Sequence, residues 1–116
     1  MPKTVLVIED ETDLCLLLKA FFVRKKYEVA TAATLEEGLK QIDLKIPDIL
    51  FLDNNLPDGL GWEHASALTE KYPDLFLNLI SAYHPSLPNV KVTSRLKIWE
   101  KPISLRDLDA YLDTLV

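Results

Sequence analysis

Five short apolar runs, spaced along a chain of 116 residues, constrain the fold more than any other feature of this sequence. The runs occupy residues 4–8, 27–31, 48–52, 75–80 and 96–99. The first, third and fourth are almost continuously apolar, which is typical of strands covered on both faces of a parallel sheet. The second is weaker and the fifth is short. The pattern predicts five strands.

Helical patterns fill the stretches between these runs. Near the N-terminus a stripe of large apolar side chains recurs at helical spacing, at Leu14, Leu17, Leu18, Phe21 and Phe22. Thr34 with Glu37, and Ser104 with Asp107, each predict the capped start of a later helix. Strands that alternate with helices predict an α/β fold with a doubly wound, mainly parallel five-stranded sheet.

Prolines shape the second half of the chain. Residues 61–72 have the composition of a helix, which we expect to end at Pro73. The segment 82–95 contains Pro85 and Pro88 together with several β-branched residues. Each proline inside a helix costs about 3 kcal/mol. We therefore expect the fourth helix, between the last two strands, to be short or irregular.

Composition excludes several classes of protein. The net charge of -5 and the pI near 4.9 argue against a nucleic-acid-binding surface, which relies on clustered Lys and Arg. A single cysteine, Cys15, excludes an internal disulfide and fits a reducing compartment. No apolar run approaches the ~18 residues of a membrane span, and the run at residues 5–8 is too short for a signal peptide. We therefore expect a cytoplasmic protein without membrane contact.

Polar side chains follow four of the five predicted strands. Glu9 and Asp10 follow the first, Asp53 the third, Ser81 the fourth and Lys101 the fifth. In open α/β sheets, ligands bind beyond the carboxyl ends of the strands, where the strand order reverses. Three carboxylates, a hydroxyl and an ammonium group are thus expected to converge at one edge of the sheet.

This set of groups suits phosphoryl transfer. Three close carboxylates repel one another, and a divalent cation relieves the repulsion. Mg²⁺ is a hard ion that prefers oxygen ligands, whereas Zn²⁺ favours nitrogen and sulfur. A carboxylate in such a site can attack phosphorus and become an acyl phosphate. The cation and a lysine would offset charge on the equatorial oxygens, and a hydroxyl would donate a hydrogen bond to one of them.

The motifs together resemble the receiver domain of response regulators in two-component signalling, over essentially the whole chain. The matching segments are V-L-V-I-E-D-E at residues 5–11, L-D-N-N-L-P-D-G at residues 52–59, Ser81-Ala82 and Lys101-Pro102. The resemblance implies a CheY-like, flavodoxin-like sheet with strand order 2-1-3-4-5. It also implies a cis peptide bond between Lys101 and Pro102.

The resemblance also implies a role for each site residue. Asp53 would accept the phosphoryl group, with Mg²⁺ held by Glu9, Asp10, Asp53 and the backbone carbonyl of Asn55. Ser81 would bind a phosphate oxygen and Lys101 would pair with the phosphoryl group. The phosphodonor would be a sensor histidine kinase or a histidine phosphotransfer protein. The domain itself would not be an enzyme beyond catalysing its own phosphorylation and dephosphorylation.

The sequence departs from the family pattern at three places that bear on how phosphorylation would be passed on as a conformational change. The family usually has Tyr or Phe three residues before the lysine, but this position is Ile98, and the aromatic residue is Trp99. Because successive strand residues point to opposite faces, Trp99 cannot simply replace it. The segment between Ser81 and Lys101 is also about two residues shorter than usual. Finally, Asn54 follows Asp53 where the family more often has an apolar residue.

Other interpretations of these residues stay open. Glu9, Asp10 and Glu11 could be acids at a helix N-terminus, where they favour the helix dipole. The domain could be a receiver-like interaction module that works with little or no phosphorylation, given the displaced aromatic residue. A phosphohydrolase is less well supported, because Asn55 lacks the carboxyl group that such an enzyme commonly has two residues after its nucleophile.

Residues 1–116 are expected to form a single receiver domain with no output domain in this chain. The output would then lie in a downstream protein or in an output domain outside it.

Overall fold

The computed structural model describes residues 3–82 and 93–115. Its centre is a parallel sheet of five strands: β1 (Thr4–Ile8), β2 (Glu28–Ala32), β3 (Ile49–Asp53), β6 (Phe76–Ser81) and β7 (Leu96–Glu100). The strand order is β2-β1-β3-β6-β7, and every neighbouring pair is parallel. Numbered along the sheet-forming strands alone, this is the predicted order 2-1-3-4-5. The predicted fold class is confirmed.

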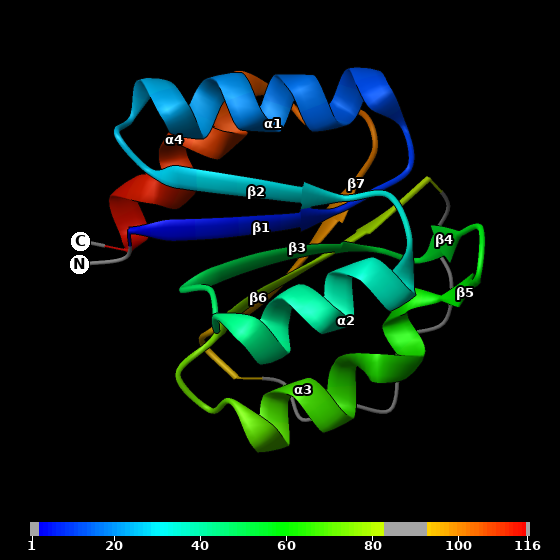
Figure 1. Cartoon of the computed structure of the whole chain (residues 1–116). Coiled ribbons are helices and arrows are strands. Elements are labelled where there is room, and N and C mark those ends of the chain that lie inside the picture. The colour runs from blue at the N-terminus through cyan, green and yellow to red at the C-terminus, as the bar shows by residue number, and fades with distance from the viewer. Residues whose placement is uncertain (1–2, 83–92, 116) are drawn as a thin grey trace.

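Helices cover both faces of the sheet (Figure 1). On one face lie α1 (Thr12–Arg24) and α4 (Leu105–Thr114), and on the other lie α2 (Leu35–Leu44) and α3 (Ala65–Lys71). The predicted caps are present: Thr34 Oγ1 accepts a hydrogen bond from Glu37 N at 3.2 Å, and Ser104 Oγ accepts one from Asp107 N at 3.1 Å. The expectation of a short or irregular fourth helix falls mainly on residues 83–92, which lie outside the described residues.

Two local features differ from the sequence-based expectation. A small antiparallel hairpin, β4 (Asn55–Leu56) with β5 (Gly59–Leu60), follows β3 and was not predicted. The helix expected over residues 61–72 is divided into a 3₁₀ turn, η1 (Gly61–His64), and α3. The hairpin turns the chain back so that Gly61 N donates to the carbonyl of Asn54 at 3.0 Å. This bond satisfies the N–H group of Gly61, the first residue of η1.

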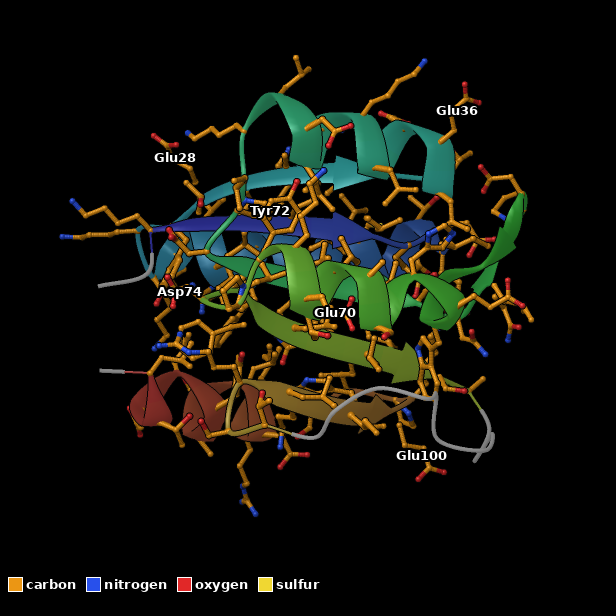
Figure 2. The ribbon with its side chains drawn as sticks, turned by 90° about the horizontal axis from the view of Figure 1, so that it is seen from below. Glu28, Glu36, Glu70, Tyr72, Asp74 and Glu100 are labelled. Atoms are coloured by element: carbon orange, nitrogen blue, oxygen red, sulfur yellow. The ribbon has the colours of Figure 1, made fainter. Side chains whose placement is uncertain are left out.

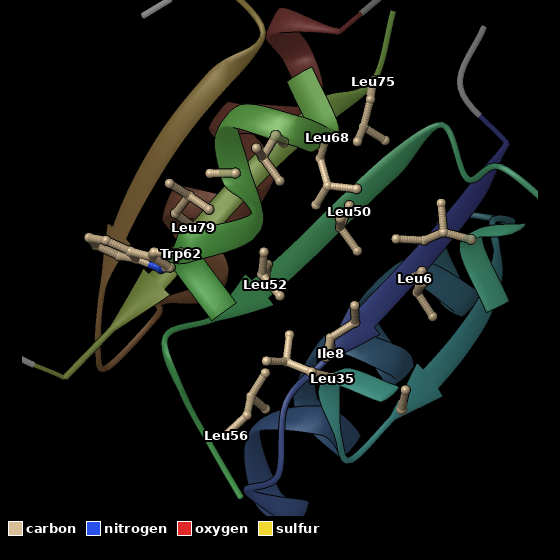
Figure 3. Packing of buried hydrophobic residues seen from close by; sticks show 14 residues of the cluster. Leu6, Ile8, Leu35, Leu50, Leu52, Leu56, Trp62, Leu68, Leu75 and Leu79 are labelled. Carbon is tan, nitrogen blue, oxygen red and sulfur yellow. The ribbon is translucent and has the colours of Figure 1, made fainter. Parts of the chain in front are cut away.

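The core has two layers, one on each face of the sheet. Side chains alternate between the faces along each strand. Leu6, Ile8, Leu50, Leu52 and Leu79 pack towards α2 and α3, as Figure 3 shows for this cluster. The opposite cluster, beneath α1 and α4, is richer in aromatic residues: Phe21, Phe22, Phe51, Trp99 and Tyr111.

A buried polar residue interrupts the aromatic layer. Asn78, in the middle of β6, is fully buried. Its Oδ1 accepts a hydrogen bond from Trp99 Nε1 at 2.9 Å, and its Nδ2 donates to Tyr111 Oη at 2.9 Å and to the Leu50 carbonyl at 3.3 Å. One amide side chain therefore connects β3, β6, β7 and α4. Because buried polar groups are costly unless they are paired, this network fixes how α4 packs on the sheet.

The acidic side chains outside the site lie on the periphery. Glu28, Glu36 and Glu100 point away from the ribbon in Figure 2, and all three are exposed. Within the described part of the chain, no helix is long and apolar enough to cross a membrane.

Candidate functional site

The candidate site lies at the carboxyl ends of β1, β3 and β7. Glu9, Asp53 and Lys101 each come two positions after a residue of the aromatic layer, namely Val7, Phe51 and Trp99. Strand alternation therefore directs all three side chains to the α1/α4 side of the sheet. The ends of parallel strands bring together residues that are far apart in the sequence.

Three carboxylates meet at this edge, as predicted. Glu9, Asp10 and Asp53 each offer an oxygen, and these atoms all lie within 4.8 Å of one another. Glu9 and Asp53 are each about 1% exposed, whereas Asp10 is exposed. Neither Asp53 oxygen has a hydrogen-bond partner among the described residues. Asp53 is thus a buried carboxylate with two oxygens available for chemistry.

Lys101 supplies the positive charge of the site. Its Nζ lies 3.0 Å from Glu9 Oε1 and 3.5 Å from Asp53 Oδ1, and its side chain is 14% exposed. It also donates a hydrogen bond of 2.8 Å to Oε1 of Glu11. Three carboxylates therefore share one ammonium group, which leaves an excess of negative charge in the site.

The burial of this charge shows in the pKa values. Burial raises the pKa of Glu9 from 4.5 to about 7, and the nearby Asp53 charge adds to the rise while Lys101 opposes it. Burial also raises the pKa of Asp53, against the opposing effect of Lys101. The carboxylates hold the pKa of Lys101 above its usual value despite partial burial. Such shifts are typical of sites where charged groups are used chemically.

The other predicted site residues lie at neighbouring strand ends. Ser81 is buried at the end of β6, and its carbonyl accepts a hydrogen bond from Lys101 N at 2.9 Å. The cis peptide bond between Lys101 and Pro102 is present, as the resemblance implied. Asn55 begins β4, two residues after Asp53. The roles of the Ser81 hydroxyl and the Asn55 carbonyl stay predictions.

The loop after Asp53 is fixed at both of its ends. Asn54 Oδ1 accepts a hydrogen bond from Trp62 N at 3.2 Å, which gives the unusual polar residue a structural role. In the hairpin turn, Asp58 accepts hydrogen bonds from the N–H groups of Leu35 at 2.8 Å and Glu36 at 2.9 Å. These bonds lower the pKa of Asp58. The loop that leaves Asp53 therefore also caps the N-terminus of α2.

The two candidates for a switch side chain lie on opposite faces of β7. Ile98 is 41% exposed, whereas Trp99 is 5% exposed. Trp99 contacts the Tyr111 ring edge-to-face, with centroids 5.5 Å apart, and donates its Nε1 hydrogen to Asn78. The expectation that Trp99 does not take the place of residue 98 agrees with this geometry.

The carboxylate cluster fits Mg²⁺. All three ligand side chains are carboxylates, and neither Asp53 oxygen has a hydrogen-bond partner among the described residues. Mg²⁺ is commonly held by one or two carboxylates together with waters and phosphate oxygens. Exposed Asp10 leaves the cluster open on the solvent side, where such ligands can enter.

Comparison with known families agrees with the fold. The sequence matches the family model of the response regulator receiver domain over residues 5–113. The protein belongs to this family.

Two relatives of this receiver domain have names that describe transcriptional regulatory proteins. It is 36% identical over 80 residues to the alkaline phosphatase synthesis transcriptional regulatory protein PhoP of Bacillus subtilis, a match that covers 66% of this chain and 33% of PhoP. It is 35% identical over 72 residues to the TorCAD operon transcriptional regulatory protein TorR of Escherichia coli O157:H7, covering 61% of this chain and 31% of TorR. The matches span about a third of these relatives.

Solved structures of receiver domains superpose over nearly the whole chain. A CheY-like receiver domain protein from Methanospirillum hungatei has a TM-score of 0.82 at 25% identity and covers 99% of this chain and 94% of its own. The response regulator TrrA from Thermotoga maritima, solved in complex with Mg²⁺ and BeF, has a TM-score of 0.81 at 27% identity, covering 98% and 99%.

Sequence reasoning missed one residue of the site. The sequence predicts Glu11 only as an acid at a helix N-terminus, yet its carboxylate is closer to Lys101 than that of Glu9 or Asp53. Its partner is 90 residues away in the sequence, so no local pattern indicates the pair.

Proposed function

We propose that this receiver domain is a phosphoacceptor switch, in which Asp53 accepts a phosphoryl group from a sensor histidine kinase or a histidine phosphotransfer protein in a Mg²⁺-dependent reaction. The observation that carries the proposal is Asp53 itself: a carboxylate 1% exposed at the end of the central strand, beside Lys101. TrrA, which shares the fold at 27% identity, was solved with Mg²⁺ and BeF.

In the proposed reaction, an Asp53 oxygen attacks the phosphorus atom of a phosphohistidine. The new P–O bond forms as the P–N bond breaks, and the electron pair of that bond goes to the imidazole nitrogen. Lys101 pairs with the phosphoryl oxygens, and the Ser81 hydroxyl donates a hydrogen bond to one of them. Glu9, Asp10, Asp53 and the Asn55 carbonyl would hold Mg²⁺, which when bound offsets the negative charge on the transferred group.

A phosphodonor of small size tests this proposal. The purified protein is incubated with acetyl phosphate and Mg²⁺, and the intact mass shows whether a phosphoryl group is added. Asp53→Asn should abolish the addition, because an amide is a poor nucleophile. Asp13→Asn, which removes a carboxylate from the first turn of α1, should retain it. Labelling that persists in Asp53→Asn would show that the phosphoacceptor is another residue.

A receiver-like interaction module that works without phosphorylation is the second candidate. It is favoured by the hydrogen bond that ties Trp99 to Asn78, because a tied aromatic residue does not rotate freely. Beryllofluoride, a phosphoryl mimic, separates the two candidates when its binding and the NMR shifts of Ile98, Trp99 and α4 are followed together. Binding that shifts only residues of the acidic site would favour the interaction module.

The proposed function implies protein partners and a cytoplasmic location. The signal would pass to a downstream protein or an output domain, with no nucleic acid bound by this domain and with the cytoplasm as its location. The net charge of -5 supports the absence of direct nucleic-acid contact.

A further inference from the structure

Glu11 forms an ion pair with the ammonium group of Lys101, which the proposed phosphoryl transfer requires. Lys101 Nζ donates a hydrogen bond of 2.8 Å to Glu11 Oε1 but lies 3.5 Å from Asp53 Oδ1. The Glu11 side chain is 59% exposed, whereas that of Asp53 is 2% exposed. The lysine thus has its two closest contacts with the solvent-facing Glu11 and, at 3.0 Å, with the buried Glu9. Both oxygens of Asp53 are left without a hydrogen bond from the described residues.

The position of Glu11 is itself fixed by the site. Glu11 is the N-cap residue of α1, and its backbone N–H donates to Glu9 Oε2 at 3.1 Å. Cys15 adds a second contact to the same turn, because its thiol donates to the Glu9 carbonyl at 3.1 Å. The Glu11 backbone is therefore tethered directly to a residue of the acidic cluster, while its side chain extends across the site entrance to Lys101.

We propose that Glu11 is a positioning residue that competes with the phosphoryl group on Asp53 for Lys101. In the unphosphorylated domain Glu11, together with Glu9, holds the ammonium group closer to itself than to Asp53. A phosphoryl group on Asp53 brings new anionic oxygens towards Lys101, and the contact with Glu11 has to weaken for Lys101 to pair with them. Glu11 therefore lowers the affinity of the site for a phosphoryl group. This inference rests on the proposed function.

The affinity for beryllofluoride at saturating Mg²⁺ tests the competition. In Glu11→Gln the charge that competes for Lys101 is absent, so binding should tighten by about twofold to fivefold, the range expected for one exposed ion pair. In Glu11→Asp the charge stays, but the side chain is one methylene shorter and loses its reach to Lys101. This variant should tighten binding in the same direction.

A matched control separates contact from general charge. Asp13→Asn removes one negative charge two residues further along, and Asp13 is not one of the described carboxylates that pair with Lys101. It should change beryllofluoride affinity less than either Glu11 variant. The Mg²⁺ affinity of each variant, measured without beryllofluoride, shows that the metal site is saturated in every titration.

NMR of the metal-free protein gives an independent reading of the contact. With lysine labelled at Cε, the Lys101 signal should move in Glu11→Gln and stay in place in Asp13→Asn. Equal beryllofluoride affinities in wild type and both Glu11 variants would overturn the competition while leaving the phosphoacceptor function intact. The same conclusion would follow if Asp13→Asn tightened beryllofluoride binding as much as the Glu11 variants do. Absence of beryllofluoride binding in the wild type would instead overturn the proposed function, and with it this inference.

Discussion

Gly61 lies where the backbone of Asp53 leaves no room for a side chain. A Cβ atom at this position would collide with the carbonyl oxygen of Asp53 and would crowd the side chain of Leu52. The carbonyl belongs to the central strand and cannot move aside as a side chain can. Gly61 therefore allows the chain to turn back closely against Asp53.

We predict that Gly61→Ala destabilises the domain by about 1–3 kcal/mol, the usual cost of forcing extra volume into a packed site. Urea unfolding monitored by circular dichroism measures the change. Gly38→Ala is the matched comparison, because the added Cβ would meet the side chain of Ile8 rather than backbone. Ile8 can adjust in part, and alanine favours the helix, so this variant should lose less stability. An equal loss in both variants would contradict the explanation.

At the scale of elements, Asn78 joins three strands to the C-terminal helix. Its partners Trp99 and Tyr111 lie 21 and 33 residues further along the chain. The three groups are buried, so each depends on the others for its hydrogen bonds. The packing of α4 on β6 and β7 is consequently specified by polar contacts as well as by apolar area.

We predict that Asn78→Leu destabilises the domain by about 1–3 kcal/mol, because it leaves the Trp99 indole N–H and the Tyr111 hydroxyl buried without this partner. Tyr111→Phe removes the hydroxyl alone. In the double variant the buried hydroxyl no longer needs a partner, so its loss of stability should be smaller than the sum of the two single losses. A double-mutant cycle from urea unfolding measures this coupling, and strict additivity would show that the hydrogen bond contributes nothing.

At the scale of the whole molecule, the acidic cluster links folding to pH. The pKa of Glu9 is raised by burial from 4.5 to about 7. A carboxyl group that titrates higher in the folded state favours folding below its unfolded pKa, and this contribution is lost as the pH rises through the folded value. The metal-free domain should therefore lose part of its stability between about pH 4.5 and pH 7.

Glu9→Gln provides the comparison for this prediction, because an amide does not titrate. Urea unfolding in the presence of a chelator should give a wild-type stability that falls across this range relative to the variant. Mg²⁺ should stabilise the wild type more at a pH above about 7 than at about pH 5, since a metal ligand must be deprotonated. A constant difference between wild type and variant across the range would show that Glu9 does not titrate there.

The sequence was sufficient for the sheet and for most of the acidic site. Continuous apolar runs and the polar residues that follow them are local signals, so the strands and the meeting of Glu9, Asp10 and Asp53 could be predicted. The hairpin β4/β5 was missed because two-residue strands carry no periodicity. The partner of Glu11 and the Asn78 network depend on contacts between distant parts of the chain, which local patterns do not encode.

Lys101 is synthesised later than the carboxylates that it contacts, because proteins are made from the N-terminus. Glu9, Asp10 and Asp53 all lie within the first 53 residues, the first two just after β1 and Asp53 at the end of β3. Lys101 follows β7, an edge strand that pairs only with β6 in the described sheet. During translation the carboxylates emerge from the ribosome well before the lysine. A nascent chain that ends before β7 therefore has all three carboxylates of the cluster but lacks the ammonium group that lies beside them in the complete fold. Under the proposed function, such a chain cannot yet pair a phosphoryl group with Lys101.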